Sequence, residues 1–89
     1  MGRNQSVISG TVRDRVGNPV GGARVYFTSG PVALPDIAAL TDDTGSFSLS
    51  APSPGTYEIE SAADGFSPAS VTVQVNGDQE THLEITLKD

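Results

Sequence analysis

The stretch ISGTVRDRVGNPVGGARVYF, residues 8–27, contains two runs in which apolar and polar residues alternate, separated by a segment rich in glycine. Alternation with a period of two places successive side chains on opposite faces of a β-strand. The stretch therefore predicts two half-buried strands, and Pro19 marks the break between them because it has no N–H for a strand ladder. The side chains expected on the buried face are Ile8, Gly10, Val12, Ala23, Val25 and Phe27.

The same alternation continues through the rest of the chain, and no long window has the spacing of an amphipathic helix. Asn76 and Gly77 separate the last two runs, and this pair predicts a β-hairpin because both residues tolerate a positive φ. Seven short strands with turns at regular spacing predict a β-sandwich. The five further strands are expected at residues 38–41, 46–50, 56–62, 70–75 and 81–88. Their buried faces are expected to carry Phe47, Leu49, Tyr57, Ile59, Ser61, Val71, Val73, Val75, Leu83, Ile85 and Leu87.

The segment TDDTGSFSLS, residues 41–50, places two carboxylates in front of a glycine. In a turn, Asp42 would accept hydrogen bonds from nearby backbone amides, Gly45 would take a positive φ and Phe47 would return to the core. The alternative is a calcium site built from Asp42, Asp43 and Asp14. Calcium takes about six to eight oxygen ligands, and the segment lacks the alternating acids of an EF-hand loop. We therefore expect a turn, and we expect the chain to use no metal or other cofactor.

Composition excludes several classes of partner. The net charge is −6 at pH 7, so the phosphates of nucleic acids and anionic membranes would be repelled. The chain has no cysteine, which excludes disulfides, thiolate nucleophiles and zinc–sulfur sites. No apolar run is long enough for a membrane-spanning helix or a signal peptide, so we expect a mature protein or an excised domain without membrane insertion.

Several spaced blocks of residues follow one another in a fixed order. The first is G-x-V-x-D-x-x-G-x-P followed by G-A-x-V, the second is T-D-x-x-G-x-F-x-L, and the last two are P-G-x-Y and A-x-G-F. Over residues 7–88 this order resembles the carboxypeptidase regulatory-like domain. The resemblance implies an all-β fold, a seven-stranded Greek-key β-sandwich of the transthyretin-like (prealbumin-like) type. The residues in these blocks are Gly10, Val12, Asp14, Gly17, Pro19, Gly22, Ala23, Val25, Thr41, Asp42, Gly45, Phe47, Leu49, Gly55, Tyr57, Ala63, Gly65 and Phe66.

Candidate catalytic groups are few. His82 is the only histidine, and it falls on the polar face of the last strand beside Glu80 and Glu84. No motif gives it the nucleophile and orienting group that nucleophilic catalysis requires. Hydroxyisourate hydrolase, which has the transthyretin-like fold, needs several histidines and a C-terminal Y-R-G-S motif that this chain lacks. Lys88 is the only lysine and lies at the C-terminal end, which excludes the isopeptide crosslink of collagen-adhesin B-type domains. We therefore predict that the protein is not an enzyme.

Two surfaces are candidates for recognition. Tyr26 is the only strand aromatic expected to face outward, and one ring is a small platform for stacking on a sugar. In the apolar loop at residues 31–40, Val32, Leu34 and Ile37 would either cover an open end of the sandwich or dock a neighbouring domain. Strand edges are a further route to a partner, since their free amides accept an added strand.

Together these features predict that residues 7–88 form a non-catalytic accessory domain, which acts as a structural spacer or a protein-interaction module. The family resemblance implies a larger, extracytoplasmic or secreted bacterial protein, whose neighbouring domains are the expected partners. Residues 1–6 are expected to be disordered or derived from an expression vector. The isolated domain is expected to be monomeric. The alternative function is binding of carbohydrate or another ligand through loop residues.

Overall fold

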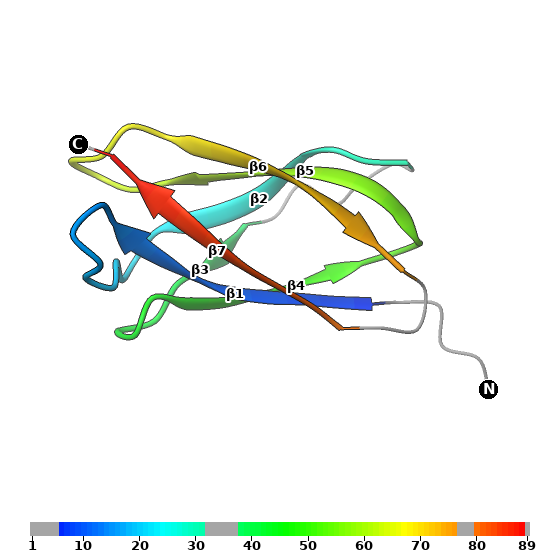
Figure 1. Ribbon diagram of the computed structural model, residues 1–89, viewed down its shortest axis with the longest axis horizontal. Helices are drawn as coiled ribbons and strands as arrows, with labels where there is room; N and C mark the ends of the chain where they lie inside the picture. Colours follow the sequence, from blue (N-terminus) through cyan, green and yellow to red (C-terminus); the bar gives the residue numbers. More distant parts are fainter. Residues whose placement is uncertain (1–5, 32–37, 77–79, 89) are drawn as a thin grey trace.

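The computed structural model describes residues 6–31, 38–76 and 80–88, and within them all regular secondary structure is β-strand (Figure 1). The strands are β1 (Ser6–Asp14), β2 (Arg24–Ser29), β3 (Ala39–Leu40), β4 (Ser46–Ala51), β5 (Gly55–Ala62), β6 (Ala69–Val75) and β7 (Thr81–Leu87). These seven strands lie where the alternating runs predicted them, and the short strand expected around residues 38–41 is β3.

The strands form two sheets that pack face to face. One has three strands in the order β4–β1–β7, and the other has four strands in the order β3–β2–β5–β6. β1 is central in the smaller sheet, where it pairs antiparallel with β4 and parallel with β7. The four-stranded sheet is antiparallel throughout. The predicted all-β, seven-stranded sandwich is therefore confirmed.

The core fills the space between the sheets with the alternate residues of each strand. Its largest fully buried side chain is Tyr57, whose ring centroid lies 5.0 Å from that of Phe27. The Tyr57 hydroxyl donates a hydrogen bond to the carbonyl of Ser53 and accepts one from the Ser53 N–H at 3.1 Å, which fixes the turn between β4 and β5. The buried apolar residues are Ile8, Val12, Val20, Ala23, Val25, Phe47, Leu49, Ala51, Tyr57, Ile59, Val75, Ile85 and Leu87. Four residues predicted on the buried face are only partly buried but pack against this core: Phe27, Val71, Val73 and Leu83.

The connection between the last two strands is not the hairpin that Asn76 and Gly77 predicted. β6 is an edge of the four-stranded sheet and β7 is an edge of the three-stranded sheet, so the chain crosses between the sheets after Asn76. β7 pairs with β1 instead, in a parallel register that runs from Ile8 opposite Thr81 to Asp14 opposite Leu87. The hairpin prediction is wrong because a turn signal describes only its own residues and not the strand with which the next segment pairs. Gly77 itself lies outside the described residues.

The connection between β1 and β2 and the turn between β3 and β4 are bound to each other at one end of the sandwich. The buried hydroxyl of Thr41 donates to the Val20 carbonyl at 2.7 Å and accepts from the Ala23 N–H at 2.9 Å. The Thr41 N–H also donates to the Ala23 carbonyl at 3.0 Å, and the Val12 N–H donates to the Gly45 carbonyl at 2.8 Å. These bonds hold the turn between β3 and β4 against β1 and the connection that follows it.

Candidate interaction surface

Tyr26 lies on the outer face of the four-stranded sheet, opposite Glu60 of β5. Its side chain is half-buried, and its phenol lies near the Glu60 carboxylate. Burial, together with the nearby negative charge of Glu60, raises the pKa of the Tyr26 phenol. The ring therefore offers a small aromatic surface whose phenol group lies beside a carboxylate.

The other residues predicted for a recognition surface, Val32, Leu34 and Ile37, lie outside the described residues. The described start of their loop is Pro31, which lies against the turn between β4 and β5. A Cβ built on Gly55 of that turn would lie 2.7 Å from the Pro31 Cγ. A docking role for the apolar residues of this loop stays a prediction.

Asp42 organises the turn before β4. Its Oδ1 accepts hydrogen bonds from the Thr44 hydroxyl at 2.7 Å and from the N–H groups of Thr44 and Ser46 at 3.0 Å each. These bonds hold the pKa of Asp42 below its ordinary value, and the bond from the Thr44 hydroxyl is the largest cause. Gly45 has φ +78°, so the predicted turn, with its amide-binding aspartate and positive-φ glycine, is confirmed.

Asp14 has the same role at the end of β1. Its Oδ1 accepts hydrogen bonds from the N–H groups of Val16 at 3.0 Å and Asn18 at 2.9 Å. The Asn18 amide, as the largest cause, holds the pKa of Asp14 below its ordinary value. Arg13 closes the loop from the other side by donating from Nη1 to the Gly17 carbonyl at 3.0 Å. Both carboxylates are therefore bound to backbone amides.

A calcium site would need several oxygen ligands in one place. Across residues 6–31, 38–76 and 80–88, no group of three or more His, Asp or Glu side chains is placed to hold a metal ion. Asp14 and Asp42, two of the three aspartates in the calcium alternative, accept hydrogen bonds in two separate turns. The arrangement that the structure gives these carboxylates is that of turn residues.

His82 is exposed on the outer face of β7, in register with Ser9 of β1. Its strand neighbour Glu84 is exposed too, and the Arg13 Nε lies 3.9 Å from the Glu84 Oε2. Although Ser9 lies opposite His82 in the ladder, no hydrogen bond between their side chains is seen among the described residues. The outer face of this sheet also carries small hydroxyl side chains, and Ser48, Ser50 and Thr86 among them are exposed.

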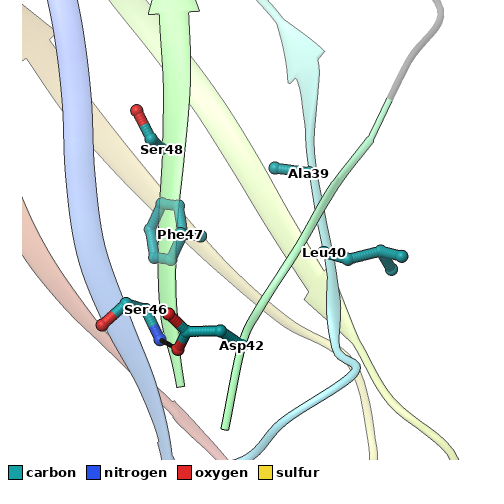
Figure 2. A pocket seen from close by; sticks show the side chains of 6 residues that line it. All are labelled: Ala39, Leu40, Asp42, Ser46, Phe47 and Ser48. Atoms are coloured by element: carbon teal, nitrogen blue, oxygen red, sulfur yellow. Dashed lines mark hydrogen bonds between the residues drawn. The ribbon is translucent and has the colours of Figure 1, made fainter. Parts of the chain in front are cut away.

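A groove opens between the edge strands of the two sheets (Figure 2). It has a volume of about 430 Å³ and lies between β3 and β4. Figure 2 shows Ala39 pointing toward the side on which the Phe47 ring lies, whereas Leu40 points away from it. Leu40 is 66% exposed. The residues that line the groove are Ala39, Leu40, Asp42, Ser46, Phe47 and Ser48.

This groove and the buried Thr41 are the features that sequence reasoning missed. The uncharged run SFSLS, residues 46–50, was a signal for the groove, because an edge strand without charge or proline is open to pairing. The buried hydroxyl of Thr41 had a weaker signal, namely that this threonine begins the T-D-x-x-G block. Neither signal says which strand forms an edge or where a hydroxyl is buried.

Comparison with known proteins places the chain among β-sandwich modules. The family model of the carboxypeptidase regulatory-like domain matches residues 7–88. A viral protein named structural protein 27, from the virus isolate Australia/Victoria, is 33% identical over 78 residues, which cover 88% of this chain and 14% of that protein. The chain therefore spans only a small part of this curated relative.

Two solved structures share the fold. The major pilin subunit of Bacillus cereus matches with a TM-score of 0.75 at 13% identity, over 93% of this chain and 28% of that one. Chlorocatechol 1,2-dioxygenase from Pseudomonas putida matches with a TM-score of 0.69 at 14% identity, over 97% of this chain and 61% of that one. Within the described residues no helix is long and apolar enough to span a membrane.

Proposed function

Because this chain belongs to the carboxypeptidase regulatory-like domain family, we propose that it is a non-catalytic β-sandwich module of a larger, extracytoplasmic protein. In that protein it acts as a rigid spacer or as a site for protein interaction, and on its own it is monomeric. A relative named a structural protein and a pilin subunit of the same fold support this role. Residues 1–5 are proposed to lie outside the module, whereas Ser6, which the sequence placed with them, is the first residue of β1 and pairs with Ala51.

The observation that supports the proposal is where the polar and ionisable side chains lie on the two sheets. Asp14 and Asp42 use their carboxylates to hold turns, and His82 stands on an outer face with no nucleophile bound to it among the described residues. In the same part of the chain, the buried residues between the sheets are apolar apart from Thr41 and Ser61. Such an arrangement suits a block that holds its shape and presents outer faces and edges to other molecules.

The proposal is tested by exchanging the module in the protein that carries it. Residues 7–88 are replaced in one variant by an unrelated β-sandwich of the same length, and in another by a flexible linker. A spacer tolerates the sandwich but not the linker, whereas an interaction module tolerates neither. If assembly and activity of the parent protein survive both exchanges unchanged, the proposal is wrong.

The alternative, a module that binds carbohydrate or another ligand, rests on Tyr26. Its half-buried ring lies on the outer face between Arg24 and Glu60, a setting in which a sugar hydroxyl finds polar partners. A glycan array together with the variant Tyr26→Ala tests this alternative. Specific glycan binding that Tyr26→Ala abolishes without loss of thermal stability would favour the alternative over the spacer role.

A further inference from the structure

Among the described residues β4 pairs on one side only, with β1. In an antiparallel pair, residues alternate between those that exchange hydrogen bonds with the partner strand and those whose peptide groups point away. The Val12 N–H donates to the Gly45 carbonyl at 2.8 Å, which fixes the phase of this alternation. Phe47 and Leu49 therefore bond toward β1, whereas the N–H and C=O groups of Ser48 and Ser50 point toward the open edge.

Ser46 confirms this phase, because its outward peptide groups are used by the preceding turn. The Ser46 N–H donates to the Asp42 Oδ1 at 3.0 Å, and its carbonyl accepts from the Asp42 N–H at 3.1 Å. The turn thus occupies the outward N–H and C=O groups of Ser46 and of no later residue of β4. From Ser48 onward no other described strand pairs with this edge.

The other edge of the same sheet is better protected. β7 carries Glu84 on its outer face, and the residue after β7, Lys88, accepts a hydrogen bond from the Ser67 N–H at 2.6 Å. β4 has neither a charged residue nor a proline, which are the usual devices against edge pairing. Of the two edges of this sheet, β4 is therefore the one that can pair with an added strand.

The groove beside β4 gives an added strand a place for its side chains. Residues opposite Ser48 and Ser50 would point to the outer face, beside these small hydroxyl groups. The residue between them would point inward, over the apolar wall formed by Ala39 and Phe47. A matching segment therefore alternates small polar residues with apolar ones.

Charge indicates the composition of the segment. The chain has a net charge of −6, and the exposed Asp42 and Asp43 stand immediately before β4. An antiparallel strand would bring its C-terminal end to these carboxylates, where Lys or Arg would be attracted. Asp42 remains charged to low pH, since the Thr44 hydroxyl and the turn amides hold its pKa below the ordinary value.

We propose that β4 accepts an extended segment of a partner protein as an antiparallel strand, one that alternates hydroxyl and apolar residues and ends in basic residues. This inference rests on the proposed function, because it names the surface and partner class of the interaction module. Main-chain hydrogen bonds to Ser48 and Ser50 supply affinity, and the groove and the carboxylates select the sequence.

The first test is a titration with a short peptide in which threonine and valine alternate and which ends in two lysines. Bound as proposed, it slows amide hydrogen exchange at Ser48 and Ser50, which exchange rapidly in the free protein, and shifts the NMR signals of Ala39 and Leu40. A peptide with glutamates in place of the lysines binds at least about tenfold more weakly, and added salt weakens the lysine peptide.

Two pairs of variants make the test specific. Ser48→Pro removes the edge donor without removing a bond to β1, and it lowers peptide affinity at least about tenfold, whereas its control Ser48→Val keeps the N–H and binds as the original does. Asp43→Asn weakens binding, whereas Asp64→Asn, which changes the charge equally in the turn after β5, does not. Both proline and valine variants are checked for an unchanged unfolding midpoint.

The inference is overturned if the peptide leaves the Ser48 and Ser50 amides exchanging rapidly, or if Ser48→Pro binds it unchanged. Self-association of the protein through β4 in place of peptide binding overturns it as well. Failure here is distinct from failure of the proposed function. If the module exchange impairs the parent protein but Ser48→Pro does not, the interaction uses another surface and the proposed function stands.

Discussion

The aromatic ring of Phe47 in β4 lies over Gly10 of the neighbouring strand β1. The two residues are paired in the ladder, and a Cβ built on Gly10 would lie 3.0 Å from the Phe47 Cζ. The same Cβ would lie 2.0 Å from the carbonyl oxygen of Leu83 in β7. The missing side chain of Gly10 thus makes room for the ring on one side and for the β7 backbone on the other.

Gly10→Ala is therefore expected to destabilise the protein by about 3 kcal/mol or more, because the nearest atom belongs to backbone and cannot rotate away. The measurement is chemical denaturation followed by circular dichroism. Ser9→Ala, which places the same residue on the outer face of β1, serves as the control and is expected to change stability by less than about 0.5 kcal/mol. An unchanged midpoint for Gly10→Ala would mean that β7 does not approach β1 as described.

Substitutions at Gly45 and Gly65 distinguish two causes of lost stability, namely the left-handed backbone conformation and the steric clash of an added Cβ. Their φ values are +78° and +87°, but a Cβ on Gly65 meets nothing within 4 Å, whereas one on Gly45 lies 2.5 Å from the Val12 carbonyl oxygen. Gly65→Ala should cost about 1–2 kcal/mol from the left-handed conformation alone. Gly45→Ala should cost about 1–3 kcal/mol more than that, as urea denaturation of both variants will measure. Equal losses would contradict the close approach of Val12.

The hydroxyl of Thr41 is expected to contribute more to stability than that of a surface threonine. Thr41→Val keeps the shape but leaves the Val20 carbonyl and the Ala23 N–H without their partner, so it should cost about 1–3 kcal/mol. Thr86→Val, on the outer face of β7, is the matched control and should stay within about 0.5 kcal/mol. Similar unfolding midpoints for the two variants would argue against the Thr41 bridge.

The Asp42 carboxylate links stability to acid pH. Because its pKa in the folded protein is lowered, first by the Thr44 hydroxyl, its stabilising effect is fully present above the unfolded value of about 3.9. That effect is lost as the pH falls from there through the folded pKa. Asp42→Asn, which keeps an oxygen acceptor but does not titrate, is expected to flatten this part of the stability curve, measured by denaturation between about pH 2 and 5.

Thr44→Val tests the cause of the shift directly. Loss of the hydroxyl at 2.7 Å removes the largest cause, so the pKa of Asp42 should rise toward its ordinary value. An NMR titration of the Asp42 side-chain carboxyl reports this change. If the pKa does not move, the backbone amides of Thr44 and Ser46 alone account for the shift.

Ser61 differs from Thr41, because no hydrogen bond to its buried hydroxyl is seen among the described residues. Its side chain is 0% exposed, and its hydroxyl has no hydrogen-bond partner among the described residues. Ser61→Ala is therefore expected to raise stability by up to about 1 kcal/mol, because it removes an unsatisfied polar group. Ser70→Ala on the exposed face of β6 is the control in the same thermal melt. A marked loss of stability in Ser61→Ala would reveal a partner for the hydroxyl.

The sequence by itself determined the strands, the faces they bury and the turn before β4. These properties depend on neighbours two to four residues apart, as in the alternation around Ile59 or the approach of the Thr44 and Ser46 amides to Asp42. A period of two suffices to place side chains on opposite faces of a strand wherever that strand lies. The family blocks added the order of the elements.

Only the tertiary structure decided which strands meet. The pairing of β7 with β1, the ring of Phe47 over Gly10, the bridge made by Thr41 and the open edge at Ser48 all join residues far apart in the sequence or depend on such contacts. A turn signal such as Asn76-Gly77 carries no information about such pairing, because the choice of partner strand is set by burial of whole faces against each other.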